Sequence, residues 1–181
     1  MTRSRYKIVE NKYPHFMTCT IVEWLKVFNT PSCVQIIFDA WNYARKNQGL
    51  QILGYVIMPH HLHMIARAPD LSKVMQSFKS ITAKRIIEDV TNLGKEHLLL
   101  AFEDFKRTHK SESTYQVWQE GNHPQELTNE HMIRQKLDYM HSNPLRAGLV
   151  TRSEDWPYSS VRNYLGLESP FEIDKNWRGL E

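Results

Sequence analysis

Residues 51–67 read QILGYVIMPHHLHMIAR, and this stretch decides the fold and points to the chemistry. An apolar run rich in β-branched side chains comes first, Pro59 and His60 then allow a turn, and apolar residues afterwards alternate with histidines. The pattern predicts a β-hairpin, because alternate side chains of a strand lie on the same face of the sheet. His61 and His63 would project together from one face, close enough to bind one metal ion.

The other predicted elements complete an α+β fold. The sequence predicts a strand over 15–22, a helix from Pro31 to about residue 48, a helix from about Asp70, a polar insertion with one short helix over about 91–113, a fourth strand over 114–118 and a last helix over about 128–142. The order β-α-β-β-α-β followed by a helix is that of the ferredoxin-like split β-α-β motif, with an antiparallel sheet.

Composition indicates one domain with an ordinary core. The chain has 181 residues, of which 41% are hydrophobic and 24% charged, and its formal net charge is +3. It shows no apolar stretch of membrane-spanning length, no signal-peptide pattern and only two cysteines, which excludes a disulfide framework. We therefore expect a single cytoplasmic domain over 1–181, whose residues after about 153 form a tail anchored on it.

The predicted last helix carries a tyrosine outside its apolar stripe. That stripe consists of Ile133, Leu137 and Met140. Tyr139 lies off the stripe, and Asn143 is four residues further on, on the same face as Tyr139. Pro144 disfavours helical geometry at Asn143, so we expect the helix to end there with the amide oxygen of Asn143 free. In an arbitrary chain, such a tyrosine packs its ring on the domain and such an asparagine caps the helix.

Two motifs in this order resemble the single-tyrosine HUH transposases, and most closely the branch of REP-associated tyrosine transposases. They are MPHHLHMI at 58–65 and LDYMHSNPLRAGL at 137–149. The shorter strings VWQ at 117–119 and WPYSS at 156–160 also resemble that branch, so the similarity covers nearly the whole chain. A lone His-x-His is a weak signal, whereas its combination with the Tyr-x-x-x-Asn-Pro helix is a specific one.

The resemblance implies a metal-dependent endonuclease and transposase that cleaves and rejoins hairpin-flanked single-stranded DNA through a 5′-phosphotyrosine intermediate. His61 and His63 match the metal-binding histidines, Tyr139 matches the nucleophile, and Asn143 matches the polar amide that completes the metal site. Mixed nitrogen and oxygen ligands suit Mg²⁺ or Mn²⁺. His60 stands where the family commonly has asparagine. Strand alternation directs it to the opposite face, so we do not count it as a ligand.

Several basic residues and one aromatic residue are candidates for DNA contacts. These are Lys79, Lys84, Arg85, Trp118 and Arg146. Lysine and arginine would hold the phosphate backbone, and an exposed tryptophan would stack a base, although charges on a solvated helix face are equally common. In HUH relatives the tyrosine helix acts within one chain or is exchanged between two. A monomer and a homodimer therefore both stay open.

Two other readings of the same residues stay open. In the first, His61 and His63 hold zinc for structure or simple hydrolysis, and the nearest further ligands are His123, Glu126 and His131. In the second, the chain binds hairpin DNA as a regulatory or domesticated relative without cleaving it.

Overall fold

The computed structural model describes residues 12–106 and 114–177. Its elements in chain order are β1 (His15–Thr20), η1 (Val22–Trp24), η2 (Val27–Asn29), α1 (Pro31–Gln48), β2 (Gln51–Met58), β3 (His61–Arg67), α2 (Leu71–Asn92), α3 (Glu96–Asp104), β4 (Gln125–Glu126), α4 (Glu130–His141), α5 (Asn143–Arg146), η3 (Ser153–Asp155) and α6 (Val161–Tyr164). The predicted hairpin, first strand and first helix are confirmed. The helix predicted over about 128–142 is α4.

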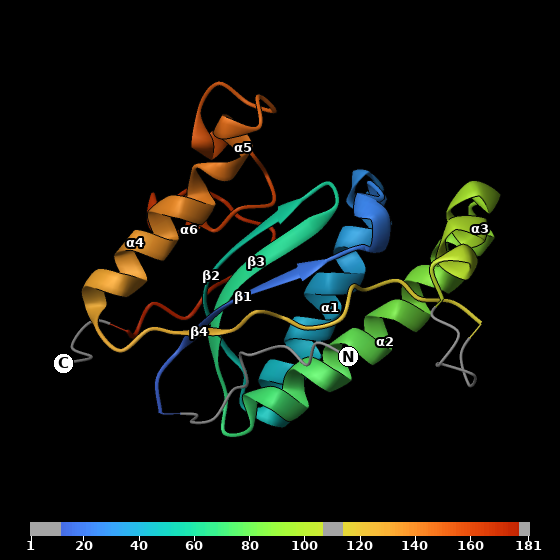
Figure 1. Cartoon of the computed structure of the whole chain (residues 1–181). Coiled ribbons are helices and arrows are strands. Elements are labelled where there is room, and N and C mark those ends of the chain that lie inside the picture. Colours follow the sequence, from blue (N-terminus) through green and yellow to red (C-terminus); the bar gives the residue numbers. More distant parts are fainter. Residues whose placement is uncertain (1–11, 107–113, 178–181) are drawn as a thin grey trace.

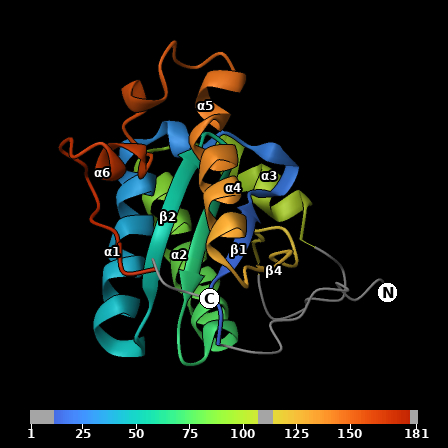
Figure 2. The same ribbon diagram turned by 90° about the vertical axis from the view of Figure 1, so that its left-hand side faces the viewer.

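The four strands form one antiparallel sheet in the order β2-β3-β1-β4. This is the strand order of the ferredoxin-like split β-α-β fold, which confirms the predicted fold class. Helices α1 and α2 cover one face of the sheet and α4 covers the other (Figures 1 and 2). Among the described residues, no helix combines the length and the apolar character that crossing a membrane requires.

Each face of the sheet has its own apolar core. Leu62 and Met64 belong to the larger core, which β1 and β3 share with α1 and α2. Ile65 belongs to the smaller core, together with Leu137 and Met140 of α4. Because His61 and His63 alternate with Leu62 and Met64, the two histidines lie on the face that α4 covers.

The predicted fourth strand over 114–118 is wrong. These residues run beside the end of β1, but they make a single bridge, between Ile21 and Trp118. The fourth strand is β4, which pairs with His15 and Phe16 at the other end of β1. Between residues 114 and 126 the chain thus meets β1 twice, at Trp118 near one end and at β4 near the other. Neither contact forms a long strand.

The segment predicted as a polar insertion with one short helix, over about 91–113, contains the end of α2 and the short helix α3 in its described part. Helix α2 continues to Asn92, and α3 begins at Glu96. Leu98 and Phe102 of α3 are buried in the larger core, so α3 is part of the packed domain. Residues 107–113 of the predicted insertion lie outside the described residues.

The C-terminal segment lies along the outer edge of β2, as expected for an anchored tail. The Ile57 amide donates to Tyr158 O over 2.9 Å, and Val56 bridges to Ser159 in antiparallel fashion. The indole of Trp156 donates to Ile57 O. These bonds satisfy backbone groups of β2 that no other strand of the sheet pairs.

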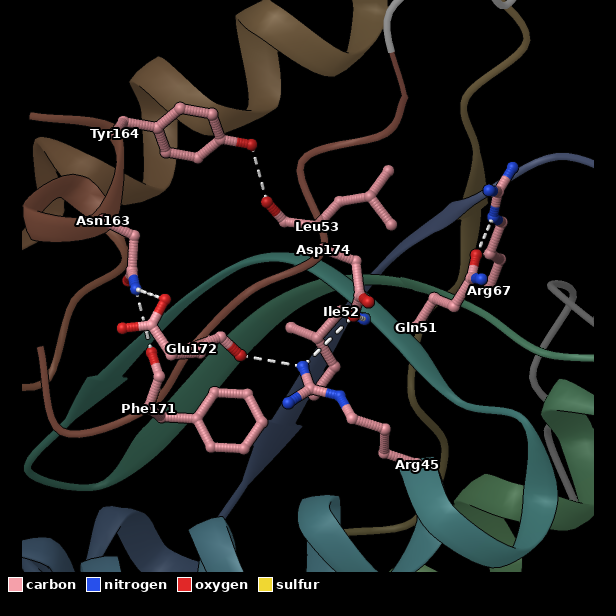
Figure 3. A network of polar contacts seen from close by, with 10 residues as sticks. All are labelled: Arg45, Gln51, Ile52, Leu53, Arg67, Asn163, Tyr164, Phe171, Glu172 and Asp174. Atoms are coloured by element: carbon pink, nitrogen blue, oxygen red, sulfur yellow. Dashed lines mark hydrogen bonds and ion pairs between the residues drawn. The ribbon is translucent and has the colours of Figure 1, made fainter. Parts of the chain in front are cut away.

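Polar contacts further along the tail fix it to α1 and β2 (Figure 3). The Arg45 guanidinium, near the end of α1, donates to Glu172 O over 2.7 Å and forms a 3.1 Å ion pair with Asp174. The Tyr164 hydroxyl donates to Leu53 O over 2.7 Å. The described part of the tail, up to residue 177, is therefore integrated into the domain.

Candidate active site

The paired histidines lie at the beginning of β3, and their ring nitrogens converge. His61 Nε2 and His63 Nε2 are 3.2 Å apart. Metal–nitrogen distances to histidine are about 2.0–2.1 Å, so both nitrogens are close enough together to bind one ion. The predicted common face of the two side chains is observed, and the geometry fits a shared divalent cation.

Burial keeps both imidazoles neutral. It lowers the pKa of His61 to about 4, with a smaller contribution from the nearby His60. It lowers the pKa of His63 to about 3, with smaller contributions from His61 and Lys136. Metal binding requires a neutral imidazole with a free lone pair. At neutral pH both rings are thus in the form that binds a metal ion.

Two residues of β1 hold the His63 ring in place. Thr18 pairs with His63 across the two strands, and Thr18 Oγ1 is 2.8 Å from His63 Nδ1. Phe16 stacks on the same imidazole at a centroid distance of 5.2 Å. With Nδ1 engaged by the hydroxyl, the Nε2 atom is left to face His61.

Tyr139 lies beside this pair on helix α4. Asn129 caps the helix by accepting a hydrogen bond from the Met132 amide. The Tyr139 ring is 42% exposed, and its centroid is 5.6 Å from that of His63. Its position off the apolar stripe, as predicted, leaves the ring free of the core while keeping it next to the histidines.

A glycine of β2 allows α4 to approach the sheet. A Cβ atom at Gly54 would lie 2.4 Å from Leu137 Cδ2 and 2.8 Å from Met140 Cε. Both of these side chains belong to the apolar stripe of α4. The absence of a side chain at Gly54 therefore leaves room for the ends of the Leu137 and Met140 side chains against β2.

Two cationic side chains flank the tyrosine. Lys136 Nζ is 5.8 Å and Arg146 Cζ is 5.7 Å from the centre of the Tyr139 ring. Arg146 was a predicted DNA contact, whereas Lys136 was not singled out in the sequence. The only sequence signal for Lys136 is its spacing, three residues before Tyr139 and therefore on a neighbouring part of the helix surface.

Asn143 lies one turn beyond Tyr139, and its setting differs from the prediction. Ser142 is the C-cap of α4, and Asn143 begins the short helix α5, with Pro144 in its first turn. The helical direction therefore continues, because proline is tolerated at the start of a helix. Asn143 Nδ2 is buried without a hydrogen-bond partner among the described residues, and the structure records no hydrogen bond from Asn143 to His61 or His63. The Nδ2 atom is an N–H donor, so any metal ion bound by Asn143 would be held by Oδ1 instead.

His60 does not follow the strand alternation expected for it. It lies in the turn before β3, and its ring centroid is 4.6 Å from that of His61. The described residues contain no group of three or more His, Cys, Asp or Glu side chains that could hold a metal ion. The described residues therefore do not support the zinc alternative with His123, Glu126 or His131 as further ligands.

Comparison with known proteins identifies the family and the fold. The sequence profile of the family described as IS200-like transposases matches residues 8–117, which include both histidines. The chain belongs to the IS200-like transposase family. Tyr139 lies beyond the matched segment of this IS200-like transposase. No curated protein matches its sequence significantly.

Two solved structures resemble this IS200-like transposase. A REP-associated tyrosine transposase bound to a REP hairpin has 19% sequence identity and a TM-score of 0.66, and the match covers 99% of this chain and 96% of that one. A protein of Deinococcus radiodurans R1, described as a transposase, has 17% identity and a TM-score of 0.40, over 78% of this chain and 97% of that one. The similarity to the REP-associated tyrosine transposase shows that this chain and that protein share a fold.

The other predicted DNA contacts of this IS200-like transposase lie away from the histidines. Lys79, Lys84 and Arg85 are on α2, across the sheet from α4. The Lys79 ammonium donates to the carbonyls of Gln119 and Gly121, and Arg85 pairs with Asp39. The expected exposure of Trp118 is wrong: the residue is only 6% exposed, and its indole donates to Thr82 Oγ1.

Proposed function

We propose that this IS200-like transposase is a metal-dependent enzyme that nicks and rejoins single-stranded DNA beside a hairpin through Tyr139. One observation carries the proposal. The exposed Tyr139 ring lies beside His63, with 5.6 Å between the ring centroids, and the Nε2 atom of His63 is 3.2 Å from that of His61. A phenol of ordinary pKa is a weak nucleophile, so a tyrosine that forms a covalent intermediate needs such a neighbourhood.

In this proposal His61, His63 and Asn143 hold a Mg²⁺ or Mn²⁺ ion. The convergence of the two imidazole nitrogens supports the histidine pair. Asn143 is included for its position one helical turn beyond Tyr139, and its side-chain oxygen would be the ligand atom. The bound ion would neutralise charge on the scissile phosphate and help to orient it. Thr18 would keep the His63 ring in the orientation that leaves Nε2 facing His61.

The proposed cleavage forms a bond between Tyr139 Oη and phosphorus. The bond between phosphorus and the 3′ oxygen breaks, the phenol loses its proton, and the departing oxygen gains one to become a 3′ hydroxyl. The 5′ phosphate stays on the tyrosine, so the reverse reaction with a 3′ hydroxyl rejoins DNA without ATP. Lys136 and Arg146, at 5.8 Å and 5.7 Å from the centre of the ring, would attract the phosphate to this position.

The substrate class follows from the position of the site. The related fold is known bound to a REP hairpin, and the exposed Tyr139 ring beside the histidines is accessible to a DNA strand. We therefore propose that the whole chain acts as one HUH domain on hairpin-flanked single strands. Because Tyr139 and His63 of the same chain are neighbours, one protomer suffices for the proposed site.

Covalent trapping tests this function. The protein is incubated with Mn²⁺ and end-labelled hairpin DNA from the regions flanking its own gene, and the products are separated on a denaturing gel. We expect label attached to the 5′ phosphate side of the cut to migrate with the protein. Tyr139→Phe should lose this species while folding and binding DNA nearly as the parent does, and cleavage that persists in the variant would exclude Tyr139 as the nucleophile.

A second candidate function is hairpin binding without cleavage. The ligand set favours it, because the proposed metal site has only two ligands of the His, Cys, Asp or Glu types among the described residues. A site with few such ligands would hold the catalytic ion weakly. Under this alternative, a native gel shows a shifted hairpin and the denaturing gel shows no covalent species with any of several flanking hairpins. The same experiment thus separates the two functions.

A further inference from the structure

The chain makes an unusual turn directly after β1. Glu23 and Trp24 both have positive backbone φ angles, of 48° and 52°. Positive φ is uncommon for any residue except glycine, and for a bulky side chain it is an outlier. Two consecutive residues in this region constitute a strained segment, which persists only where its surroundings hold it.

Hydrogen bonds on both sides hold this turn. The Val22 amide donates to Val117 O over 2.9 Å, and the Leu25 amide donates to Val22 O over 3.2 Å. Val22 and Val27 are buried in the larger core. The backbone of 22–27 is therefore held on both sides of Trp24.

Burial of the Trp24 ring does not compensate for the strain. Trp24 is 60% exposed. The other four tryptophans are packed or hydrogen-bonded within the domain: Trp41, Trp118 and Trp177 are buried, and Trp156 donates to Ile57 O. A single exposed apolar residue is common on protein surfaces, but one held outward by strained backbone suggests a function for the ring.

The turn lies beside the paired histidines. Thr20, the last residue of β1, pairs with His61. The Ile21 amide donates to His60 O over 2.9 Å, and the Phe28 amide donates to Pro59 O over 3.0 Å. Both ends of the segment are thus bonded to the turn between β2 and β3, next to which Figure 1 shows it.

Lys26 adds a positive charge at the same place. It lies two residues before Phe28, whose amide donates to Pro59 O in the turn between β2 and β3. The segment therefore combines an exposed aromatic residue and a cation, three and five residues along the chain from Ile21, whose amide donates to His60 O.

We propose that Trp24 stacks on an unpaired base of the DNA strand whose phosphate lies at His61 and His63, and that Lys26 contacts the backbone beside that base. The site takes single-stranded DNA, because stacking requires a base that is free of its partner. Stacking on an aromatic ring is tolerant of sequence. This inference rests on the proposed function.

Binding measurements on matched variants test it. The probe is a fluorescein-labelled hairpin with unpaired flanks, and anisotropy reports the dissociation constant. Trp24→Ala should weaken binding by about 5- to 100-fold, the range typical of one lost base–aromatic contact. Tyr43→Ala is the control, since Tyr43 is 55% exposed on α1, and it should bind like the parent protein.

Abasic nucleotides locate the stacked base. Each unpaired position of the probe is replaced in turn by an abasic nucleotide. One position should weaken binding to the parent protein by about the same factor as Trp24→Ala, and at that position the two changes should not add, because they remove the same contact. Full additivity at every position would overturn the proposal.

Glycine substitutions separate the ring from the strained backbone. Glycine adopts positive φ without a steric cost, so Trp24→Gly and Glu23→Gly should unfold at a temperature equal to or higher than that of the parent. Only Trp24→Gly should weaken DNA binding. Equal DNA binding by the parent and all variants would overturn the proposed role of Trp24 and leave the proposed function of the protein standing. A parent protein that binds no hairpin probe would overturn the proposed function as well.

Discussion

Thr18 and His63 face one another on β1 and β3, and the hydroxyl of Thr18 is 2.8 Å from Nδ1 of His63. If the imidazole nitrogen donates this bond, the proton is fixed on Nδ1 and the lone pair on Nε2, where His61 Nε2 is 3.2 Å away. The threonine therefore acts on the proposed metal site through the histidine.

Thr18→Val should weaken Mn²⁺ binding, because valine keeps the shape of threonine and removes the hydroxyl. Loss of such an outer partner typically costs about 10- to 100-fold in metal affinity. Thr18→Ser keeps the hydroxyl and should bind Mn²⁺ within a few-fold of the parent. Isothermal titration of the metal measures both, and equal affinities of Thr18→Val and the parent would show that the bond does not tune the site.

His61→Ala should lose most of the Mn²⁺ affinity, since one of the two converging nitrogens disappears. The control is His131→Ala, which removes an exposed histidine of α4. Calorimetry without DNA measures binding independently of cleavage. Unchanged affinity in His61→Ala would remove this residue from the metal site.

Co-expression of two inactive variants tests whether the site belongs to one chain. Because Tyr139 and His63 of the same chain are adjacent, a mixture of His61→Ala and Tyr139→Phe should form no covalent DNA adduct. If the tyrosine helix were exchanged between two chains, the mixture would contain sites with both intact residues. Recovery of the adduct would therefore contradict a site within one chain.

Gly54→Val should reduce cleavage more than it reduces stability. The side chain ends of Leu137 and Met140 already occupy the space that a Cβ would fill. Movement of these ends can accommodate one methyl group, but valine would displace α4 and Tyr139 with it. We expect a loss of about 1–3 kcal/mol in the free energy of unfolding and a fall of about 100-fold in cleavage rate. Leu137→Ala in the same chain makes room and should restore part of the activity.

Stability should fall as the pH drops from about 6.5 towards 4. Burial lowers the pKa of His141 from 6.5 to about 4, and its Nε2 is 2.8 Å from Ser160 Oγ. Between these values the unfolded state binds a proton that the folded state does not, so acid favours unfolding by up to roughly 3 kcal/mol. His141→Gln should show a smaller difference in urea unfolding between pH 7 and pH 4.5. An identical difference would show that His141 does not contribute.

The parts of the fold that could be predicted from the sequence are those in which apolar residues recur at one regular spacing, that of a strand or that of a helix. The alternation through His61 and His63 and the apolar stripe of α4 each identified the element and its buried face. The fourth strand was misplaced because residues 114–118 have strand-like composition, while pairing with β1 depends on register. The burial of Trp118 against Thr82 likewise depends on packing between distant segments.

Parts of the candidate site could not be predicted from the sequence for related reasons. The proximity of Lys136 to Tyr139 depends on the side chain directions on α4, which spacing alone does not determine. The positive φ angles of Glu23 and Trp24 have no sequence signal, because such angles are usually marked by glycine. His60 was assigned by alternation, which does not apply within a turn.

The pairing of the C-terminal tail with β2 also bears on how the protein behaves when it is shortened. Residues around Tyr158 and Ser159 occupy the hydrogen-bonding edge of that strand. A protein cut before residue 153 would expose this edge, which is apolar and eight residues long. Open edges of this kind recruit strands from other molecules. Truncation should therefore cause aggregation even though the proposed catalytic side chains are all retained.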